Sequence, residues 1–88
     1  MELTDLPNLG KVVASQLEQV GIESPDELRR VGSVGAAVRL TAAGVSVCSS
    51  KLCALEGAIR GVRWHAIPVE ERAALMTRFV EAREGMSV

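Results

Sequence analysis

Apolar residues recur along the chain at the spacing of amphipathic helices, and glycines stand where those helices would end. Val13, Leu17 and Val20 lie on one face of a first predicted helix. Gly21 follows at once and is typical of the residue that ends a helix in a left-handed conformation. Ile22 then returns an apolar side chain to the core, so the pattern predicts a helix that ends just before Gly21.

A second helix is expected to begin at Ser24. The Ser24 side chain can accept hydrogen bonds from the free amides of the first turn, Pro25 suits the first helical position, and Glu27 completes a capping box. This helix is short, and it places Leu28 and Val31 toward the core.

A third helix is expected from about residue 33 to residue 43, where Gly44 ends it. The next residues, 45–48, alternate between apolar and polar side chains and could form a short strand. We reject a strand because the sequence offers no second strand for pairing, and a lone strand is not stable. Ser46 is therefore expected to cap a fourth helix.

The fourth predicted helix carries two glycines, Gly57 and Gly61, four residues apart. Each costs about 1 kcal/mol of helix stability relative to alanine, so the pair indicates a face where another backbone comes close. We expect this helix to pack tightly on another helix at both glycines, with Trp64 following as an anchor. The apolar face of the helix comprises Leu52, Leu55, Ile59 and Val62.

A fifth helix is expected after Pro68, with Glu70 and Glu71 near its positive N-terminus and Gly85 at its end. No Pro- or Ser-rich linker divides the chain, so residues 1–88 are expected to form a single domain. The predicted fold class is all-α, with five short helices in a bundle of the helix-hairpin-helix or SAM-like type. The side chains expected to be mostly buried are Leu6, Leu9, Val13, Leu17, Ile22, Leu28, Val38, Leu52, Leu55, Ile59 and Trp64.

Two turn segments, residues 6–10 and residues 31–35, share one pattern: an apolar residue, a turn residue, a small polar residue, an apolar residue and a glycine. A helix that ends in apolar–glycine–apolar follows each segment, at residues 20–22 and 43–45. We interpret this as a pseudo-repeat of two helix-turn-helix units packed about an approximate twofold axis. The alternative is that any small helical domain needs turns that contain glycine.

The first of these turns is a candidate nucleic-acid contact. Gly10 lets the backbone approach a ligand closely, and the unpaired amides that open the next helix can bind an anion such as phosphate. Lys11 places a positive charge beside them. Asn8, Gly10 and Lys11 are therefore the candidate DNA-binding residues, in a mode that grips the backbone and reads no sequence. The same turn can instead be purely structural, with Asn8 as N-cap and Lys11 solvated.

Composition narrows the class of protein. Of the 88 residues, 48% are hydrophobic but only 2% are aromatic, so the core must be aliphatic. A formal net charge of −1 argues against a strongly basic nucleic-acid binder but allows a local basic patch. No apolar run reaches the roughly 18 residues that a membrane span needs, and the first residues lack a signal-peptide pattern. Because two cysteines make no disulfide framework, we expect a reducing cytoplasm.

A second candidate feature surrounds the single tryptophan. Arg60, Arg63 and His65 lie close to Trp64 in the sequence and can form a basic edge, with an aromatic ring that could stack on a base. A lone tryptophan after an apolar helix is more typical of a core side chain. His65 has no Cys, His or carboxylate at ligand spacing, so we expect a solvated or capping histidine rather than a metal ligand.

No pattern in the sequence supports catalysis or a metal site. Cys48 and Cys53 are five residues apart and on different helix faces, so both are expected to be free thiols without metal. Glu56 lies within the apolar face of its helix, where a half-buried salt bridge, for example with an arginine of the last helix, explains it better than acid-base chemistry. Because nucleophile–base sets, phosphate-binding loops and paired carboxylates are missing, we expect no enzyme activity and no cofactor.

A more specific pattern runs through residues 6–10, 20–22, 28–32 and 55–61, followed by Trp64 and Pro68. From about Leu3 to Phe79, the chain resembles the C-terminal domain of the TfoX/Sxy family, which is named for regulators of natural competence, the uptake of DNA by bacteria. The resemblance implies a helical domain with helix-hairpin-helix character in the bacterial cytoplasm. In full-length members, which also carry an N-terminal α/β domain, it implies co-activation of competence genes alongside the transcription factor CRP.

Two functions follow as hypotheses. In the first, a regulatory domain touches DNA weakly through the hairpin at Gly10 and Lys11, or acts as a stand-alone helix-hairpin-helix DNA-binding module. In the second, the hairpins only build the fold, and the domain binds transcription machinery, a CRP-like regulator or a second copy of itself, with no membrane involved. The small number of cations favours partner binding for the isolated domain.

Overall fold

The computed structural model describes residues 1–86, which form five α-helices and two single turns of 3-10 helix. No strand occurs among these described residues, so the predicted all-α class with five helices is confirmed. The elements are η1 (Leu3–Asp5), α1 (Lys11–Gln19), α2 (Pro25–Val31), α3 (Ser33–Ala42), α4 (Ser49–Arg60), η2 (Trp64–Ala66) and α5 (Val69–Met86).

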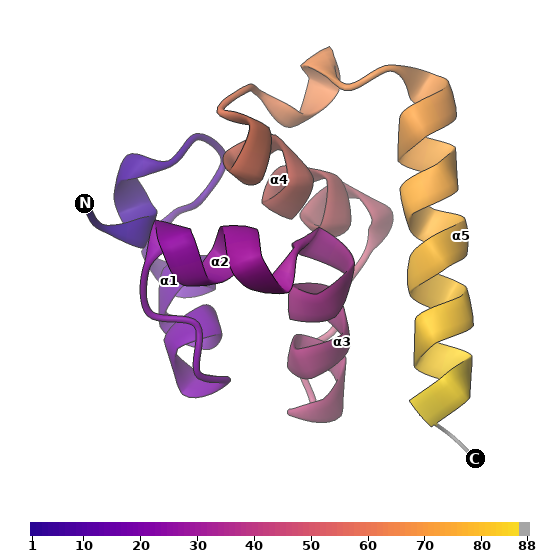
Figure 1. Ribbon diagram of the computed structural model, residues 1–88, viewed down its shortest axis with the longest axis horizontal. Coiled ribbons are helices and arrows are strands. Elements are labelled where there is room, and N and C mark those ends of the chain that lie inside the picture. Colours follow the sequence, from indigo (N-terminus) through magenta and orange to yellow (C-terminus); the bar gives the residue numbers. More distant parts are fainter. Residues whose placement is uncertain (87–88) are drawn as a thin grey trace.

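Helix α3 lies at the centre of the bundle. It packs against α1, α2, α4 and α5, and α4 in turn packs against α2, α5 and η2. Figure 1 shows α5 along one side of the molecule, with α1, α2 and the N-terminus on the opposite side. The helices therefore enclose one apolar core within a molecule that measures 36 × 29 × 20 Å.

The core is aliphatic except for Phe79, whose exposed fraction is 0%. Leu75 and Phe79 lie one turn apart on α5, and their burial shows that this helix is docked on the bundle. The predicted core is mostly confirmed, although four of its members are only half-buried: Val13, Val38, Ile59 and Trp64. Confirmed as buried are Leu6, Leu9, Leu17, Ile22, Leu28, Leu52 and Leu55, whereas Leu3, Leu40, Ile67, Leu75 and Phe79 are buried without having been predicted.

Helices α1, α3 and α4 end in the same hydrogen-bond pattern at a glycine. Gly21, Gly44 and Gly61 have φ angles of +84°, +87° and +76°. At the end of α1, the N–H of Ile22 donates to the carbonyl of Leu17 at 2.9 Å, and the other two helices repeat this bond. This is the Schellman motif, which satisfies carbonyls at the end of a helix. The predicted stops at Gly21 and Gly44 are confirmed, whereas the stop predicted at Gly85 is wrong, because α5 continues through it to Met86.

The predicted start of α2 is confirmed, and that of α4 is wrong. Ser24 Oγ accepts a hydrogen bond from the N–H of Glu27 at 3.2 Å, as a helix cap should. Ser46, however, caps nothing, because Cys48 is the N-cap of α4. The valines on either side of Ser46 pack against the core and hold this stretch of chain outside the helix.

The two glycines of α4 have different roles. Gly61 is left-handed, ends the helix and has open space where a Cβ would lie, so the close contact predicted there is wrong. Gly57 is buried at a close contact, as predicted, but its neighbours are not another helix. A Cβ at position 57 would lie 2.6 Å from Asn8 Nδ2 and 2.7 Å from the carbonyl oxygen of Val62.

The pseudo-repeat holds at the helix ends but not in the turns. Gly10 is the N-cap of α1, whereas Gly32 is the N-cap of α3 and Gly35 lies inside that helix. The first turn follows the 3-10 helix η1, while the second joins two α-helices through Gly32 alone. Residues 6–10 therefore belong to a different kind of hairpin from residues 31–35.

Candidate nucleic-acid interface

Asn8 is a structural clamp that joins the first turn to the end of α4. Its φ angle is +71°, and among the described residues it is the one non-glycine with a positive φ. Asn8 Nδ2 donates to the carbonyl oxygens of Val62 at 2.9 Å and Ala54 at 3.4 Å, and Oδ1 accepts from the backbone N–H of Trp64 at 3.2 Å. The side chain is thus bonded within the protein, and it is not the N-cap of α1.

Gly10 and Lys11 lie on the surface at the start of α1. Gly10 is the N-cap, its backbone is extended, and no side chain caps the helix. Both residues are exposed, and nothing lies within 4 Å of the place where a Cβ of Gly10 would be. The start of α1 thus presents an exposed glycine and an exposed lysine with no side-chain cap, and their predicted role in holding phosphate stays a prediction.

An open groove lies between this turn and α4. Its volume is about 370 Å³. Two of the lining side chains are cationic, one is aromatic, and none is acidic. The groove therefore suits an anionic ligand with an apolar part. The lining residues are Asn8, Val13, Ser50, Lys51, Ala54, Arg63 and Trp64.

Lys51 was not singled out by the sequence analysis. Its Nζ donates to Gln16 Oε1 at 3.1 Å and contacts the carbonyl oxygen of Ser46 at 3.5 Å. Gln16 also lines a neighbouring hollow together with Lys11. The hydrogen bond between Gln16 and Lys51 thus joins a residue of the groove to a residue of the hollow beside the start of α1. No sequence signal marks Lys51, because its role depends on how α4 packs beside α1.

Of the two arginines in the predicted basic edge, Arg60 is paired with carboxylates, whereas Arg63 is not paired with any carboxylate among residues 1–86. Arg60 pairs with Glu56 at 2.7 Å and with Glu71 at 2.7 Å, so its charge is neutralised by two carboxylates. Arg63 forms no ion pair with any residue in the range 1–86 and lines the groove. Arg60 is therefore less available to a phosphate than the sequence analysis expected, and its pairing with Glu71 depends on where α5 packs.

Glu56 forms the half-buried salt bridge that the sequence suggested, but with an arginine of its own helix. Burial alone would raise the pKa of this carboxyl group. Hydrogen bonds from Ser33 Oγ at 2.6 Å and from Arg60, with the charges of Arg60 and Arg78, outweigh burial and lower the pKa below its usual value. The ionised carboxylate is therefore stabilised in place and poorly suited to acid-base catalysis.

Trp64 is half-buried rather than a core side chain. The guanidinium of Arg72 lies over its ring, 5.6 Å from the centroid, and the ring of His65 meets it edge-on at 5.6 Å. The backbone of Trp64 is held by Asn8, and Trp64 is one of the residues that line the groove. The tryptophan thus lies at the edge of the bundle, with its backbone bonded to Asn8 and its ring against Arg72 and His65.

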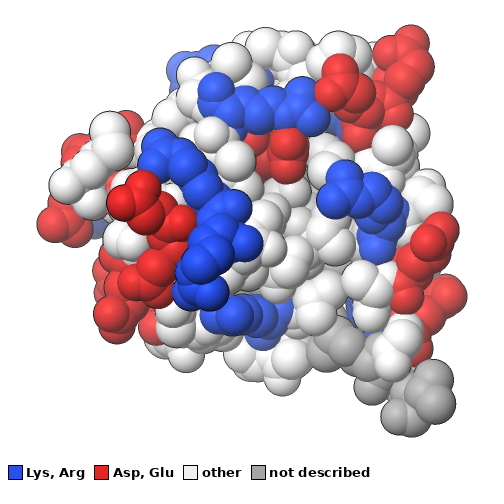
Figure 2. Space-filling view, in the orientation of Figure 1, with Lys and Arg blue, Asp and Glu red and all other residues white. Residues whose placement is uncertain are grey.

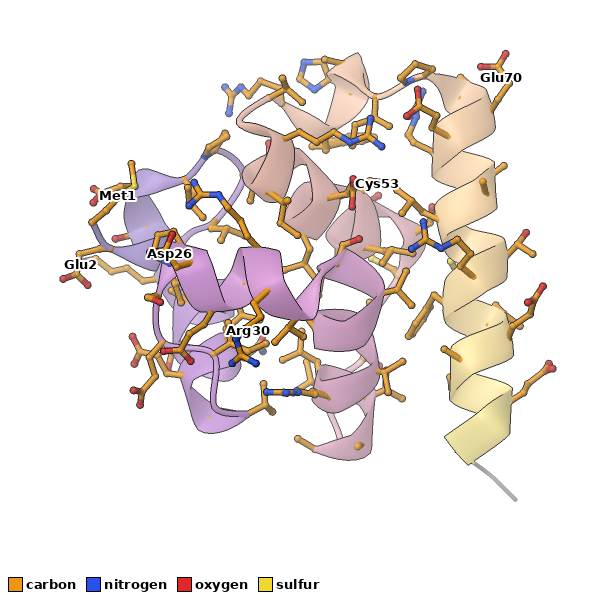
Figure 3. The ribbon with its side chains drawn as sticks, viewed as in Figure 1. Met1, Glu2, Asp26, Arg30, Cys53 and Glu70 are labelled. Atoms are coloured by element: carbon orange, nitrogen blue, oxygen red, sulfur yellow. The ribbon has the colours of Figure 1, made fainter. Side chains whose placement is uncertain are left out.

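Other basic side chains lie among acidic ones. Figure 2 shows Lys and Arg side chains gathered over α2, with acidic side chains beside them. On that helix Arg29 pairs with Asp26 at 3.1 Å, and Figure 3 shows Asp26 and Arg30 toward opposite ends. This mixed face suits a phosphate backbone less well than the acid-free groove does.

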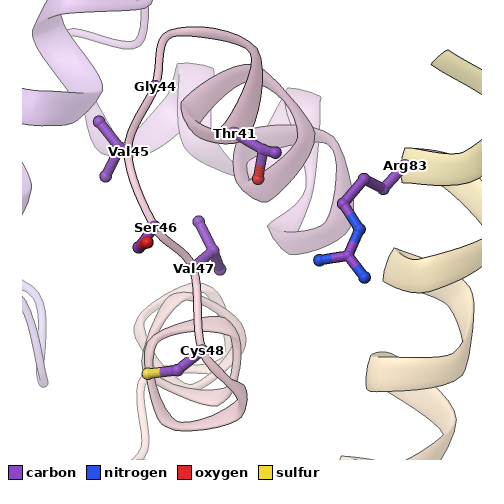
Figure 4. A pocket seen from close by; sticks show the side chains of 7 residues that line it. All are labelled: Thr41, Gly44, Val45, Ser46, Val47, Cys48 and Arg83. Carbon is purple, nitrogen blue, oxygen red and sulfur yellow. The ribbon is translucent and has the colours of Figure 1, made fainter. Parts of the chain in front are cut away.

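A further hollow of about 390 Å³ lies between the end of α3, the extended segment 44–48 and α5. Figure 4 shows Cys48 and Arg83 among its lining side chains. Cys48 is exposed and Cys53 is buried, and both are free thiols. Burial raises the pKa of Cys53 against the opposing charge of Arg72, so this thiol stays protonated at neutral pH.

Two further properties of the described residues bear on the class of site. In the range 1–86, no group of three or more His, Cys, Asp and Glu side chains is placed to hold a metal ion. Within the same range, no helix combines the length and the apolar character needed to cross a membrane.

The sequence profile of the TfoX C-terminal domain matches residues 1–79. The fold is similar to an uncharacterized protein from Listeria monocytogenes in a triclinic crystal form, with 43% identity, a TM-score of 0.82 and coverage of 86% of each chain. A protein of unknown function from the same organism, in a tetragonal form, gives 41% identity, a TM-score of 0.82 and coverage of 89% of this chain and 96% of that one. No curated protein matches the sequence.

Proposed function

Because the chain belongs to the TfoX C-terminal domain family, we propose that it is a non-enzymatic regulatory module of the bacterial cytoplasm that binds nucleic-acid backbone weakly and without sequence preference. The binding surface is the hairpin face, which we define as Gly10, Lys11, Lys51 and Arg63. In the setting that the family suggests, this contact would help a CRP-like regulator or the transcription machinery at competence promoters.

One observation carries this proposal: a groove with two cations and no acidic side chain lies close to the uncapped start of α1. Helix amides and cationic side chains are the groups that proteins use to hold phosphate. The charge of Arg60, by contrast, is already paired with the carboxylates of Glu56 and Glu71. The groove beside the start of α1 thus brings two cations together with no carboxylate in its lining.

The same observation limits the strength of binding. Three cationic side chains and a few amides can neutralise only a few phosphates, and the net charge of −1 adds no long-range attraction. Non-specific binding of this type has a dissociation constant of about 10⁻⁴–10⁻⁶ M at physiological salt and weakens steeply as salt rises.

Titration with a duplex of arbitrary sequence at two salt concentrations tests the proposal. Binding should be seen at low salt, should weaken at high salt, and should be weaker in Lys11→Glu. Because Lys11 is exposed, this variant should keep the wild-type melting temperature. The matched control is Arg30→Glu, an equal change of charge on the mixed face of α2. Equal losses in both variants, or no binding at low salt, would contradict the proposal.

The second candidate function is protein binding, and the exposure of Val12 favours it. This valine is 70% exposed and lines a hollow with Lys11, Ser15 and Val45. A partner protein or a second copy of the chain could cover it. Val12→Glu should then abolish a complex seen by size-exclusion chromatography while leaving duplex binding only modestly weaker.

A further inference from the structure

The single tryptophan is anchored through its backbone at the edge of the groove. Its backbone N–H is bonded to Asn8, and Arg72 lies over its ring. The buried aromatic position in the core is taken by Phe79 instead. Trp64 is therefore a half-buried aromatic residue of the groove wall rather than part of the core.

The groove combines this indole with groups that recognise phosphate. Lys51 and Arg63 are its cations, and Ser50 adds a hydroxyl group. A volume of about 370 Å³ lies at the small end of the range for ligand sites, which runs from about 300 to 1,000 Å³. Such a space suits one flat aromatic group with its phosphates rather than a helix or a duplex.

We propose that this groove binds an unpaired nucleobase of single-stranded nucleic acid. The base stacks on Trp64, and the phosphates on either side of it meet Lys51 and Arg63. In a duplex the faces of the bases are covered by their neighbours, so the same groove gains only the phosphate contacts from it. This inference rests on the proposed backbone binding and adds a preference for single strands over duplexes.

Fluorescence provides a direct test, because Trp64 is the one tryptophan of the chain. The intact protein is titrated with a short oligothymidylate, with a duplex of the same length and with an abasic oligomer that keeps the phosphates but lacks bases. The oligothymidylate should quench Trp64 and bind more tightly than either of the others. An oligouridylate arm then distinguishes RNA from DNA as the source of the unpaired base.

Variants separate stacking from charge. Trp64→Leu should weaken oligothymidylate binding roughly tenfold and leave duplex binding unchanged, whereas Trp64→Phe should retain most of the affinity. Affinities of the variants are measured by anisotropy of a labelled oligomer, and melting curves show that each variant is folded. Arg63→Glu, at an exposed position, should weaken binding of both nucleic acids.

The outcomes distinguish this inference from the proposed function. If the abasic oligomer or the duplex binds as tightly as the oligothymidylate, or if folded Trp64→Leu keeps wild-type affinity, stacking is refuted while backbone binding stands. If no oligomer binds at low salt, both proposals fail. An acidic peptide is also added as a competitor of the labelled oligomer. If it displaces the oligomer equally well from the wild type and from Trp64→Leu and does not quench Trp64 fluorescence, the groove binds a protein partner and the inference is refuted.

Discussion

The side chain of Asn8 holds the backbone of Trp64, which lies 56 residues later in the sequence. Oδ1 accepts the N–H of Trp64 at 3.2 Å, and Nδ2 donates to the carbonyl of Val62 at 2.9 Å. The amide thus bonds both sides of the turn that follows α4. Because the same turn carries Arg63 and Trp64, Asn8 shapes the candidate interface without having to touch a ligand.

Asn8→Gly should destabilise the protein by about 1–2 kcal/mol, because it removes these hydrogen bonds while glycine tolerates the positive φ. Asn8→Ala should destabilise the protein by about 1 kcal/mol more than Asn8→Gly does, because alanine is strained at the positive φ of this position. Urea denaturation measures both values. A stability of Asn8→Gly equal to that of the wild type would mean that the clamp contributes nothing to folding.

Gly57→Ala should destabilise by about 1–3 kcal/mol even though alanine is the better helix former. The added Cβ would meet the carbonyl of Val62 at 2.7 Å, and this backbone atom cannot move away without disturbing the turn. Gly85→Ala is the matched control, because a Cβ there meets nothing within 4 Å. Thermal melts in which both variants match or exceed the wild type would show that Gly57 is not at a tight contact.

Glu56 should make stability depend on acid pH. Its pKa is lowered below the usual 4.5 in the folded protein, so the carboxylate stabilises the fold above that pH and loses this contribution as pH falls through the folded-state pKa. Glu56→Gln should therefore be less stable than the wild type at neutral pH, and the difference should shrink below pH 4.5.

The measurement is denaturant unfolding at a series of pH values, with Glu81→Gln, an exposed change on α5, as the control. The control should follow the wild-type profile. Parallel loss of stability in Glu56→Gln and wild type across the acid range would rule out the proposed role of Glu56.

Phe79→Ala should destabilise by about 3–5 kcal/mol, because it leaves a cavity where α5 meets the core. Phe79→Leu keeps most of the volume and should cost less than about 1.5 kcal/mol. Chemical denaturation followed by circular dichroism compares the two. If the alanine variant were as stable as the leucine variant, α5 would not be docked through this side chain.

Much of the fold was predictable because its signals are local. The left-handed turn at Gly21 and the cap at Ser24 are made by hydrogen bonds between residues a few positions apart, so a short segment specifies them. The periodic leucines identified most of the core for a similar reason. The start of α4 was missed because packing of the valines beside Ser46, a non-local contact, overrides its capping propensity.

The sequence by itself determined five helices, most of their ends and the surface candidates Gly10 and Lys11. Only the tertiary structure decided that Asn8 clamps the turn at Trp64, that Glu71 neutralises Arg60, and that Lys51 and Arg63 share one groove. These contacts join residues from different elements, and their geometry depends on how the whole bundle packs. No local pattern encodes that packing, because each helix buries its apolar face equally well in several arrangements until the others constrain it.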